Sequence, residues 1–178
     1  MASIIKANQL QDFGGNSILT SDGAGNLTTQ KINYPAFEAH LSSSQSLTDA
    51  TTTKVQFNTK ICDTDNAYDN STNYRFTPQV AGKYFVYADV DADPAATAGL
   101  VSVSLFIYKN GSEFRTHELN FNSNYVRRVS AAISCVIDMN GSSDYLEIFV
   151  YVNDTSGNPQ LNATPTLNNL FGAYRIGS

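Results

Sequence analysis

Apolar and polar residues alternate in short runs along most of the chain, from Pro35 to the C-terminus. This two-residue period is that of a β-strand with one buried face, and no stretch keeps the 3.6-residue period of a helix. Turn residues separate the runs, which is typical of a β-sandwich or barrel and predicts about nine or ten antiparallel strands. The strong runs cover residues 82–92, 100–110, 112–121, 126–139 and 144–153, and weaker ones cover 35–41, 54–58, 73–79 and 169–176.

Two Asn-Gly pairs stand between strong runs, at Asn110-Gly111 and Asn140-Gly141. Asn and Gly readily adopt the positive φ that a two-residue hairpin requires. Both pairs therefore predict tight turns between neighbouring antiparallel strands.

Several runs carry large apolar side chains on both faces. In the run from Leu100, aliphatic residues share one face, while Phe106 and Tyr108 lie on the other. A sandwich needs one apolar face per strand, and monomers rarely expose large apolar patches. The surplus rings predict an interface between subunits, and the alternative is that loops of the same chain cover them. The rings expected at the subunit interface are Phe85, Tyr87, Phe106, Tyr108, Tyr145, Phe149 and Tyr151.

Residues 1–34 differ from the rest of the chain because they are polar, contain glycine and show neither a strand nor a helix period. We interpret them as an arm or linker that precedes a single β domain at 35–178. The apolar side chains of this arm are expected to anchor the chain to another protein. They are Ile4, Ile5, Leu10, Phe13, Ile18 and Leu19.

Charge and composition exclude some partners. The formal net charge of -5 provides no basic surface for nucleic acid. No apolar stretch is long enough to insert into a membrane, and the N-terminus is too polar for a signal peptide. The sequence therefore indicates synthesis in a reducing cytoplasm. In that compartment Cys62 and Cys135, each in an apolar run, are expected to be buried free thiols rather than a disulfide.

The titratable residues form no recognisable catalytic pattern, so we expect no enzyme and no catalytic residue. His40 and His117 are the only histidines, and no Ser-His-Asp or Cys-His signature accompanies them. A pair between His40 and Glu38 at a subunit interface is a less favoured alternative to an exposed or structural histidine.

Two groups of aspartates are weighed as possible ligands of a metal ion. Asp89, Asp91 and Asp93 share one face at the end of a run, and three more aspartates lie within residues 63–69. Calcium prefers several carboxylate oxygens, but neither group has a defined coordination spacing. Solvated acidic loops are the favoured interpretation, calcium is the weak alternative, and no cofactor is expected.

The order of several segments resembles the globular head of complement component q, which belongs with the tumour necrosis factor superfamily. The matching segments are PAFEAHLSSS from Pro35, VQFN from Val55, NYRFTPQVAGKYFVYADV from Asn73, VSVSLFIYKNG from Val101, DYLEIFVYVN from Asp144 and NLFGAYRI from Asn169. The resemblance implies a ten-stranded antiparallel jelly roll that packs as a homotrimer, with Tyr145, Phe149 and Tyr151 near the threefold axis. It also implies core positions for Phe37, Phe57, Phe76, Tyr84 and Phe171.

A second, shorter resemblance concerns the arm. The segment NSILTSDGAGNLTTQ is similar to segments that precede carboxy-terminal modules in tail fibres and related virion proteins of bacterial viruses, and the arm has no collagen repeat. It implies a structural protein of the virion surface, made in the host cytoplasm and attached to capsid or tail by residues 1–34. A short head or tail fibre or a capsid decoration fits the chain length. The alternative is an adhesin that binds a host-cell glycan or receptor through loop residues Tyr68, Asn124 and Tyr125.

Overall fold

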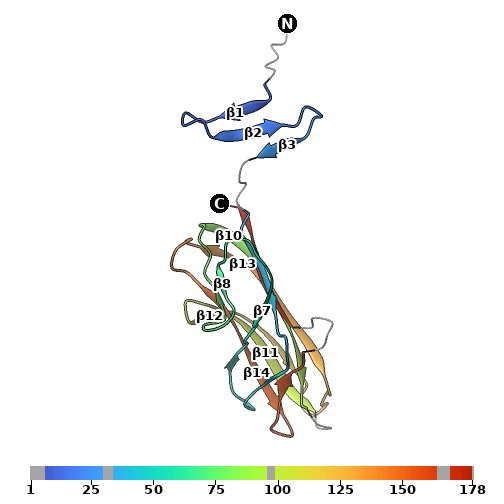
Figure 1. The fold of residues 1–178 in the computed structure, drawn as a ribbon. Helices are drawn as coiled ribbons and strands as arrows, with labels where there is room; N and C mark the ends of the chain where they lie inside the picture. Colours follow the sequence, from blue (N-terminus) through green and yellow to red (C-terminus); the bar gives the residue numbers. More distant parts are fainter. Residues whose placement is uncertain (1–6, 30–33, 96–98, 164–168, 178) are drawn as a thin grey trace. The chain divides into compact units, whose positions relative to one another are not determined.

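The computed structural model describes residues 7–29, 34–95, 99–163 and 169–177. The chain divides into two compact units, Met1–Tyr34 and Pro35–Ser178. Every element in the described part of the chain is a β-strand, and all the strand pairs are antiparallel (Figure 1). The prediction of an all-β antiparallel protein is thus confirmed. No helix that could cross a membrane occurs in those ranges.

The first unit contains a small antiparallel meander, which the sequence pattern did not predict. Its strands are β1 (Gln9–Gln11), β2 (Ser17–Ser21) and β3 (Leu27–Thr29), paired in the order β1-β2-β3. Strands of three to five residues are too short to display a clear alternation. The segment interpreted as an arm or linker therefore contains three short strands.

The two turns of this meander, ten residues apart, are closed by the same hydrogen bonds between an Asp and the Asn four residues later. The Asp12 carboxylate accepts hydrogen bonds from the backbone N–H of Asn16 at 2.8 Å and from its side-chain amide. Asp22 accepts the corresponding bonds from Asn26 at 3.1 Å and 2.6 Å. Because each turn satisfies its own polar groups, it forms locally.

The second unit is a sandwich of two antiparallel sheets. The β10 sheet has the strand order β5-β15-β10-β16-β4-β7, with β13 also paired to β10, and the β14 sheet has the order β12-β11-β14-β9-β8, with β6 also paired to β14. The strands of the β10 sheet are β4 (Ala36–His40), β5 (Gln45–Ser46), β7 (Thr59–Asp63), β10 (Gly82–Asp93), β13 (Val129–Met139), β15 (Gln160–Leu161) and β16 (Leu170–Gly177). Those of the β14 sheet are β6 (Thr53–Lys54), β8 (Tyr68–Asp69), β9 (Arg75–Phe76), β11 (Leu100–Lys109), β12 (Ser112–Asn120) and β14 (Leu146–Asp154).

The two Asn-Gly pairs have different outcomes. Asn110 and Gly111 have φ values of 54° and 77° and join β11 to β12, which confirms that two-residue hairpin. The predicted hairpin at Asn140-Gly141 is wrong, because β13 and β14 lie in different sheets. There the Asn140 side chain accepts hydrogen bonds from the backbone N–H groups of Ser142, Ser143 and Asp144. These bonds fix the loop that crosses from one sheet to the other.

The core lies between the inner faces of the two sheets and contains a cluster of aromatic rings. Phe37 of β4 stacks on Phe76 of β9 at 4.3 Å between ring centroids, and on Tyr68 of β8 at 4.8 Å. Phe171 of β16 meets Phe37 edge-on at 4.8 Å. The five rings that the family resemblance places in the core are each at most 1% exposed. They are Phe37, Phe57, Phe76, Tyr84 and Phe171.

Replacement of Phe37 tests the importance of this aromatic cluster. Phe37→Ala should lower the free energy of unfolding by about 3–5 kcal/mol, because it leaves a cavity among stacked rings. Urea denaturation measures the change. Phe114→Ala, at an exposed ring on β12, is the control and should change stability by about 0.5 kcal/mol or less. Equal effects of the two substitutions would show that the cluster is not central to the core.

Candidate functional site

The seven rings expected at one subunit interface lie on two sheets. Phe85 and Tyr87 belong to β10, and their alternation with the buried Tyr84 and Val86 places them on the outer face of the β10 sheet. The others belong to the β14 sheet, on β11, on β14 or directly before it. They are Phe106, Tyr108, Tyr145, Phe149 and Tyr151. Outer faces of a sandwich point in opposite directions, so in a threefold assembly the two groups of rings would meet different neighbours.

The rings on the outer face of the β14 sheet are partly covered by their own chain. Tyr108 and Phe149 lie 4.3 Å apart between ring centroids, and Tyr108 meets Phe106 edge-on at 6.2 Å. The Lys54 ammonium lies 5.5 Å above the Phe149 ring and 2.5 Å from a Glu147 carboxylate oxygen. A cation held over a ring replaces part of the cover that a partner would give. The same chain thus covers part of Phe149, and the place of these five rings at a subunit interface stays a prediction.

The outer face of the β10 sheet has two exposed apolar side chains next to its rings. Phe85 is flanked by Val136 on β13 and by Tyr174 on β16, which are 49% and 44% exposed. The Phe85 ring centroid lies 5.4 Å from that of Tyr174 and 6.2 Å from that of Tyr87. This outer face of the β10 sheet, around Phe85, Tyr87, Val136 and Tyr174, is the candidate functional site. We call it the aromatic face.

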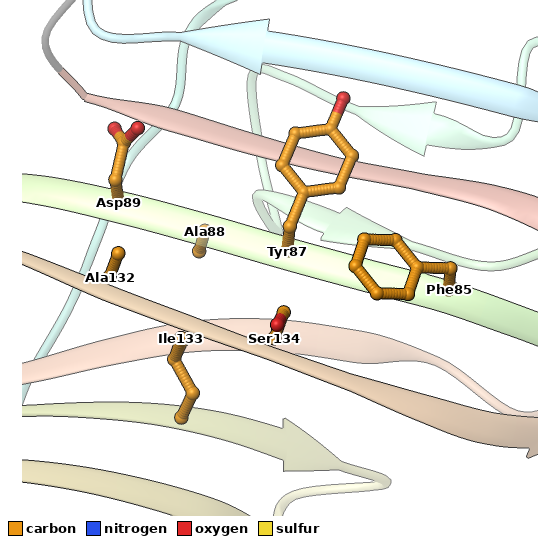
Figure 2. A pocket seen from close by; sticks show the side chains of 7 residues that line it. All are labelled: Phe85, Tyr87, Ala88, Asp89, Ala132, Ile133 and Ser134. Carbon is orange, nitrogen blue, oxygen red and sulfur yellow. The ribbon is translucent and has the colours of Figure 1, made fainter.

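A hollow of about 320 Å³ lies within the aromatic face, between β10 and β13. Figure 2 shows Phe85 and Tyr87 projecting from β10, beside the small residues Ala132 and Ser134 of β13. Small residues line one side of the hollow, and two rings with the Asp89 carboxylate line the other, so its shape can receive a side chain from a partner.

Tyr87 is fixed in place by two neighbouring strands. Its ring lies across Gly172 of β16, where any Cβ would overlap the ring. Its hydroxyl donates a hydrogen bond to the Glu38 carboxylate of β4. Burial of the phenol raises the pKa of Tyr87, and the hydrogen bond to Glu38 raises it further. Only glycine at position 172 permits this arrangement.

The cysteines are both free, as predicted, but only Cys135 is buried. Cys62 of β7 is exposed because it pairs with Glu38 at the outer side of β4. The prediction of a buried Cys62 is therefore wrong, since an apolar run does not reveal which face a residue occupies.

The three aspartates at the end of β10 bind three different partners. Asp89 accepts a hydrogen bond from the Leu170 N–H at 2.9 Å, and Asp93 accepts one from the Ala95 N–H at 2.8 Å. Asp91 forms a bidentate ion pair with Arg128, whose Nε lies 2.7 Å and 2.8 Å from the two carboxylate oxygens. Within the described residues no group of three His, Cys, Asp or Glu side chains could hold a metal ion. The calcium alternative gains no support from this geometry.

The predicted ligand residues have different environments. Tyr68 is 2% exposed, stacks on Phe37 and donates a hydrogen bond to the Phe57 carbonyl at 3.0 Å. Its assignment to a ligand loop is wrong, because β8 turns this side chain into the core. Asn124 and Tyr125 are exposed between β12 and β13 and remain a prediction.

The predicted anchoring residues of the first unit are partly available for contact. Leu10, Phe13 and Ile18 are exposed, and Leu19 is half-buried opposite Leu10 in the β1–β2 pair. Ile4 and Ile5 lie outside the described residues. Their role in anchoring remains a prediction.

Sequence reasoning missed Tyr174, although a signal for it existed. Phe171 and Ala173 face the core, so the alternation places Tyr174 on the outer face beside Phe85. The contact between Tyr87 and Glu38 had no sequence signal, because it depends on the pairing of three strands that are distant in the sequence.

Known structures show the same fold. No model of a protein family matches the sequence, and no curated protein matches it. Murine APRIL at pH 5.0 aligns with a TM-score of 0.58 and 10% identity, over 81% of this chain and 100% of that one. Eiger TNF from S. frugiperda aligns with a TM-score of 0.56 and 9% identity, over 82% and 92%. The globular domain of zebrafish complement 1qA gives 0.50 and 16%, over 81% and 98%. The second unit is thus a jelly roll similar to TNF and C1q domains.

The Asp89 carboxyl on the aromatic face should make the free energy of unfolding depend on pH. Burial raises the pKa of Asp89, and the charges of Glu38 and Asp91 raise it further. Folding therefore favours the protonated form, and the associated stability is present at low pH and lost as pH rises above the usual carboxyl range. Asp89→Asn retains an oxygen for the Leu170 N–H and should be more stable than the original protein near pH 7.5. The difference should shrink at about pH 3.

Urea denaturation at both pH values measures this difference in the free energy of unfolding. Asp138→Asn is the matched control, because Asp138 is exposed at the far end of the same face and pairs with Lys83 at 2.7 Å. This control should not gain stability near pH 7.5. A gain for Asp89→Asn that is the same at both pH values would disprove the electrostatic explanation.

Proposed function

We propose that this chain is a non-enzymatic structural protein of the virion surface of a bacterial virus, which assembles as a homotrimer through its jelly-roll unit. The observation that supports the proposal most strongly is the aromatic face, where Phe85, Val136 and Tyr174 form one row across three strands. Large exposed apolar patches mark interaction sites on soluble proteins.

Simple energetics favour several contacts made at once. Full burial of one such side chain contributes roughly 1.5–3 kcal/mol, and less where it is already half-buried. A single ring is therefore too weak to offset the entropy lost on association. Burial of the whole aromatic face by another copy combines these contributions, and the hollow beside Ala132 and Ser134 provides a place for a protruding side chain.

Attachment to the particle is assigned to residues 1–34, as a short head or tail fibre or a capsid decoration. The similarity of this segment to parts of virion proteins supports the assignment, as do its exposed apolar residues Leu10, Phe13 and Ile18. A three-stranded sheet of this size has little core of its own, so contact with another protein would stabilise it.

A receptor- or glycan-binding role is the second candidate function. The exposure of Asn124 and Tyr125 favours it, because amides and aromatic rings both bind sugars. The two functions are compatible within one molecule.

Substitutions on the two outer faces test the site of self-association. Multi-angle light scattering of the full chain should give three times the chain mass. The double substitution Phe85→Ser and Val136→Ser should weaken association at least tenfold, because it removes apolar cover from the aromatic face. The matched control, Phe106→Ser with Phe114→Ser on the β14 sheet, should remain trimeric. A monomeric original protein would contradict the proposal, and a dissociated control would move the interface to the other sheet.

Cys62 offers a second readout in the unmodified protein. Its exposed thiol lies beside Glu38 at the edge of the aromatic face, whereas Cys135 is buried. Maleimide should therefore label Cys62 more slowly in the trimer than in the Phe85→Ser, Val136→Ser variant. Equal rates would show that association does not cover this part of the sheet.

Deletion of residues 1–34 tests the attachment role. The jelly-roll unit has its own core, so the shortened chain should fold and remain trimeric. It should nevertheless be lost from purified virus particles, as detected by immunoblotting. Leu10→Ser with Phe13→Ser should reduce incorporation in the full chain, and Asn8→Ser is its polar control. Normal incorporation of the shortened chain would reject the anchoring role.

A further inference from the structure

A polar hollow of about 290 Å³ lies over β8 and β9 of the β14 sheet. Its lining combines side-chain amides, a hydroxyl, the Asp69 carboxylate and the Arg75 guanidinium, unlike the hollow on the aromatic face. It belongs to the other sheet of the sandwich, so burial of the aromatic face leaves it accessible. Its lining residues are Asn66, Ala67, Tyr68, Asp69, Asn73, Arg75, Thr77 and Gln79.

Arg75 is held at this hollow by its place in β9. Its neighbour Phe76 is buried and pairs with Leu146, so Arg75 projects from the outer face. The guanidinium carbon lies 4.6 Å from the centroid of the Tyr145 ring. Stacking of this kind fixes the guanidinium plane and leaves its N–H edges available for a ligand. The ion pairs within the described part of the chain do not include Arg75.

Asp69 lies opposite Arg75 in the β8–β9 pair but binds its own turn. Its carboxylate accepts hydrogen bonds at 3.0 Å from the backbone N–H groups of Ser71, Thr72 and Asn73, and at 2.8 Å from the Asn73 amide. The bond from Thr72, with those from Ser71 and Asn73, holds the pKa of Asp69 well below its usual range. Asp69 is therefore ionised at the rim of the hollow, where its own turn binds the carboxylate, while the N–H groups of Arg75 are left for an external ligand.

The amides of the hollow retain both donor and acceptor capacity. The side-chain oxygen of Asn66 accepts a hydrogen bond from Lys60, so the N–H groups of Asn66 are left to donate to a ligand. The side-chain N–H of Gln79 donates to the Thr77 carbonyl, so the oxygen of Gln79 is left to accept from a ligand. The Asn73 amide donates to Asp69 and likewise keeps its oxygen. A fully ionised inorganic anion only accepts hydrogen bonds, whereas sugar hydroxyls both donate and accept.

We propose that this hollow binds the carboxylate-bearing sugar of an acidic surface polysaccharide, such as a uronic or sialic acid unit. Arg75 pairs with the sugar carboxylate through two parallel N–H···O bonds, a geometry that suits the planar guanidinium. Asn66, Asn73 and Gln79 bind the ring hydroxyls. The volume lies near the lower end of small-molecule sites, roughly 300 Å³, and suits a single sugar unit.

Nuclear magnetic resonance titration of the full chain with galacturonic acid and N-acetylneuraminic acid tests this site. At least one acidic sugar should bind saturably, and neutral galactose should bind at least tenfold more weakly. Arg75→Gln should weaken binding of the acidic sugar at least tenfold. Arg127→Gln, at an exposed arginine between β12 and β13, is the charge-matched control and should bind as the original protein does.

Three results would overturn the proposal: no acidic sugar binds, Arg75→Gln binds equally well, or inorganic phosphate displaces the sugar at equal concentration. The last result would identify a site for small anions. Light scattering of the same samples separates this outcome from the proposed assembly, because loss of sugar binding should leave the trimer mass unchanged.

Discussion

The alternation of side chains along β10 is the constraint on which the jelly-roll unit depends. Tyr84, Val86, Ala88 and Val90 turn inward and close the core. The positions between them must then face outward, which brings Phe85 and Tyr87 to the surface. β10 also pairs with β13 on one side and with β16 on the other. A shift by one residue would expose the aliphatic set, so the core fixes the outer face as well.

The outward positions have unequal surroundings on the two sheets. On the β14 sheet, Lys54 reaches across Phe149 and pairs with Glu147, so polar groups occupy the space above the rings. On the β10 sheet, Tyr87 lies flat over Gly172, and Phe85 stands beside the exposed Val136 and Tyr174. Cover by the same chain is thus seen above Phe149 on the β14 sheet, whereas Val136 and Tyr174 on the β10 sheet are exposed. The polar hollow around Arg75 lies on the β14 sheet, apart from the aromatic face.

Local sequence signals predicted the strands and turns that depend only on residues adjacent in the sequence. The long strands follow a visible two-residue period, and Asn110-Gly111 forms its hairpin because both positions adopt positive φ. Asn140-Gly141 looks equivalent in sequence, yet β13 and β14 separate into different sheets. Strands of two residues, such as β8 and β9, are too short for a period, and this hid the inward turn of Tyr68 and the hollow at Arg75. The bond between Tyr87 and Glu38 joins residues 49 positions apart and depends on strand order.

The repeated turn of the first unit has a consequence for how such chains can vary in length. Asp12 with Asn16, and Asp22 with Asn26, each close a loop using groups inside the same ten-residue module. Only the bends close with their own residues, and each strand still pairs with its neighbour, so duplication of thirty nucleotides would add one bend and one strand that pairs with the strand before it. The number of strands in this meander can thus change without any new turn chemistry.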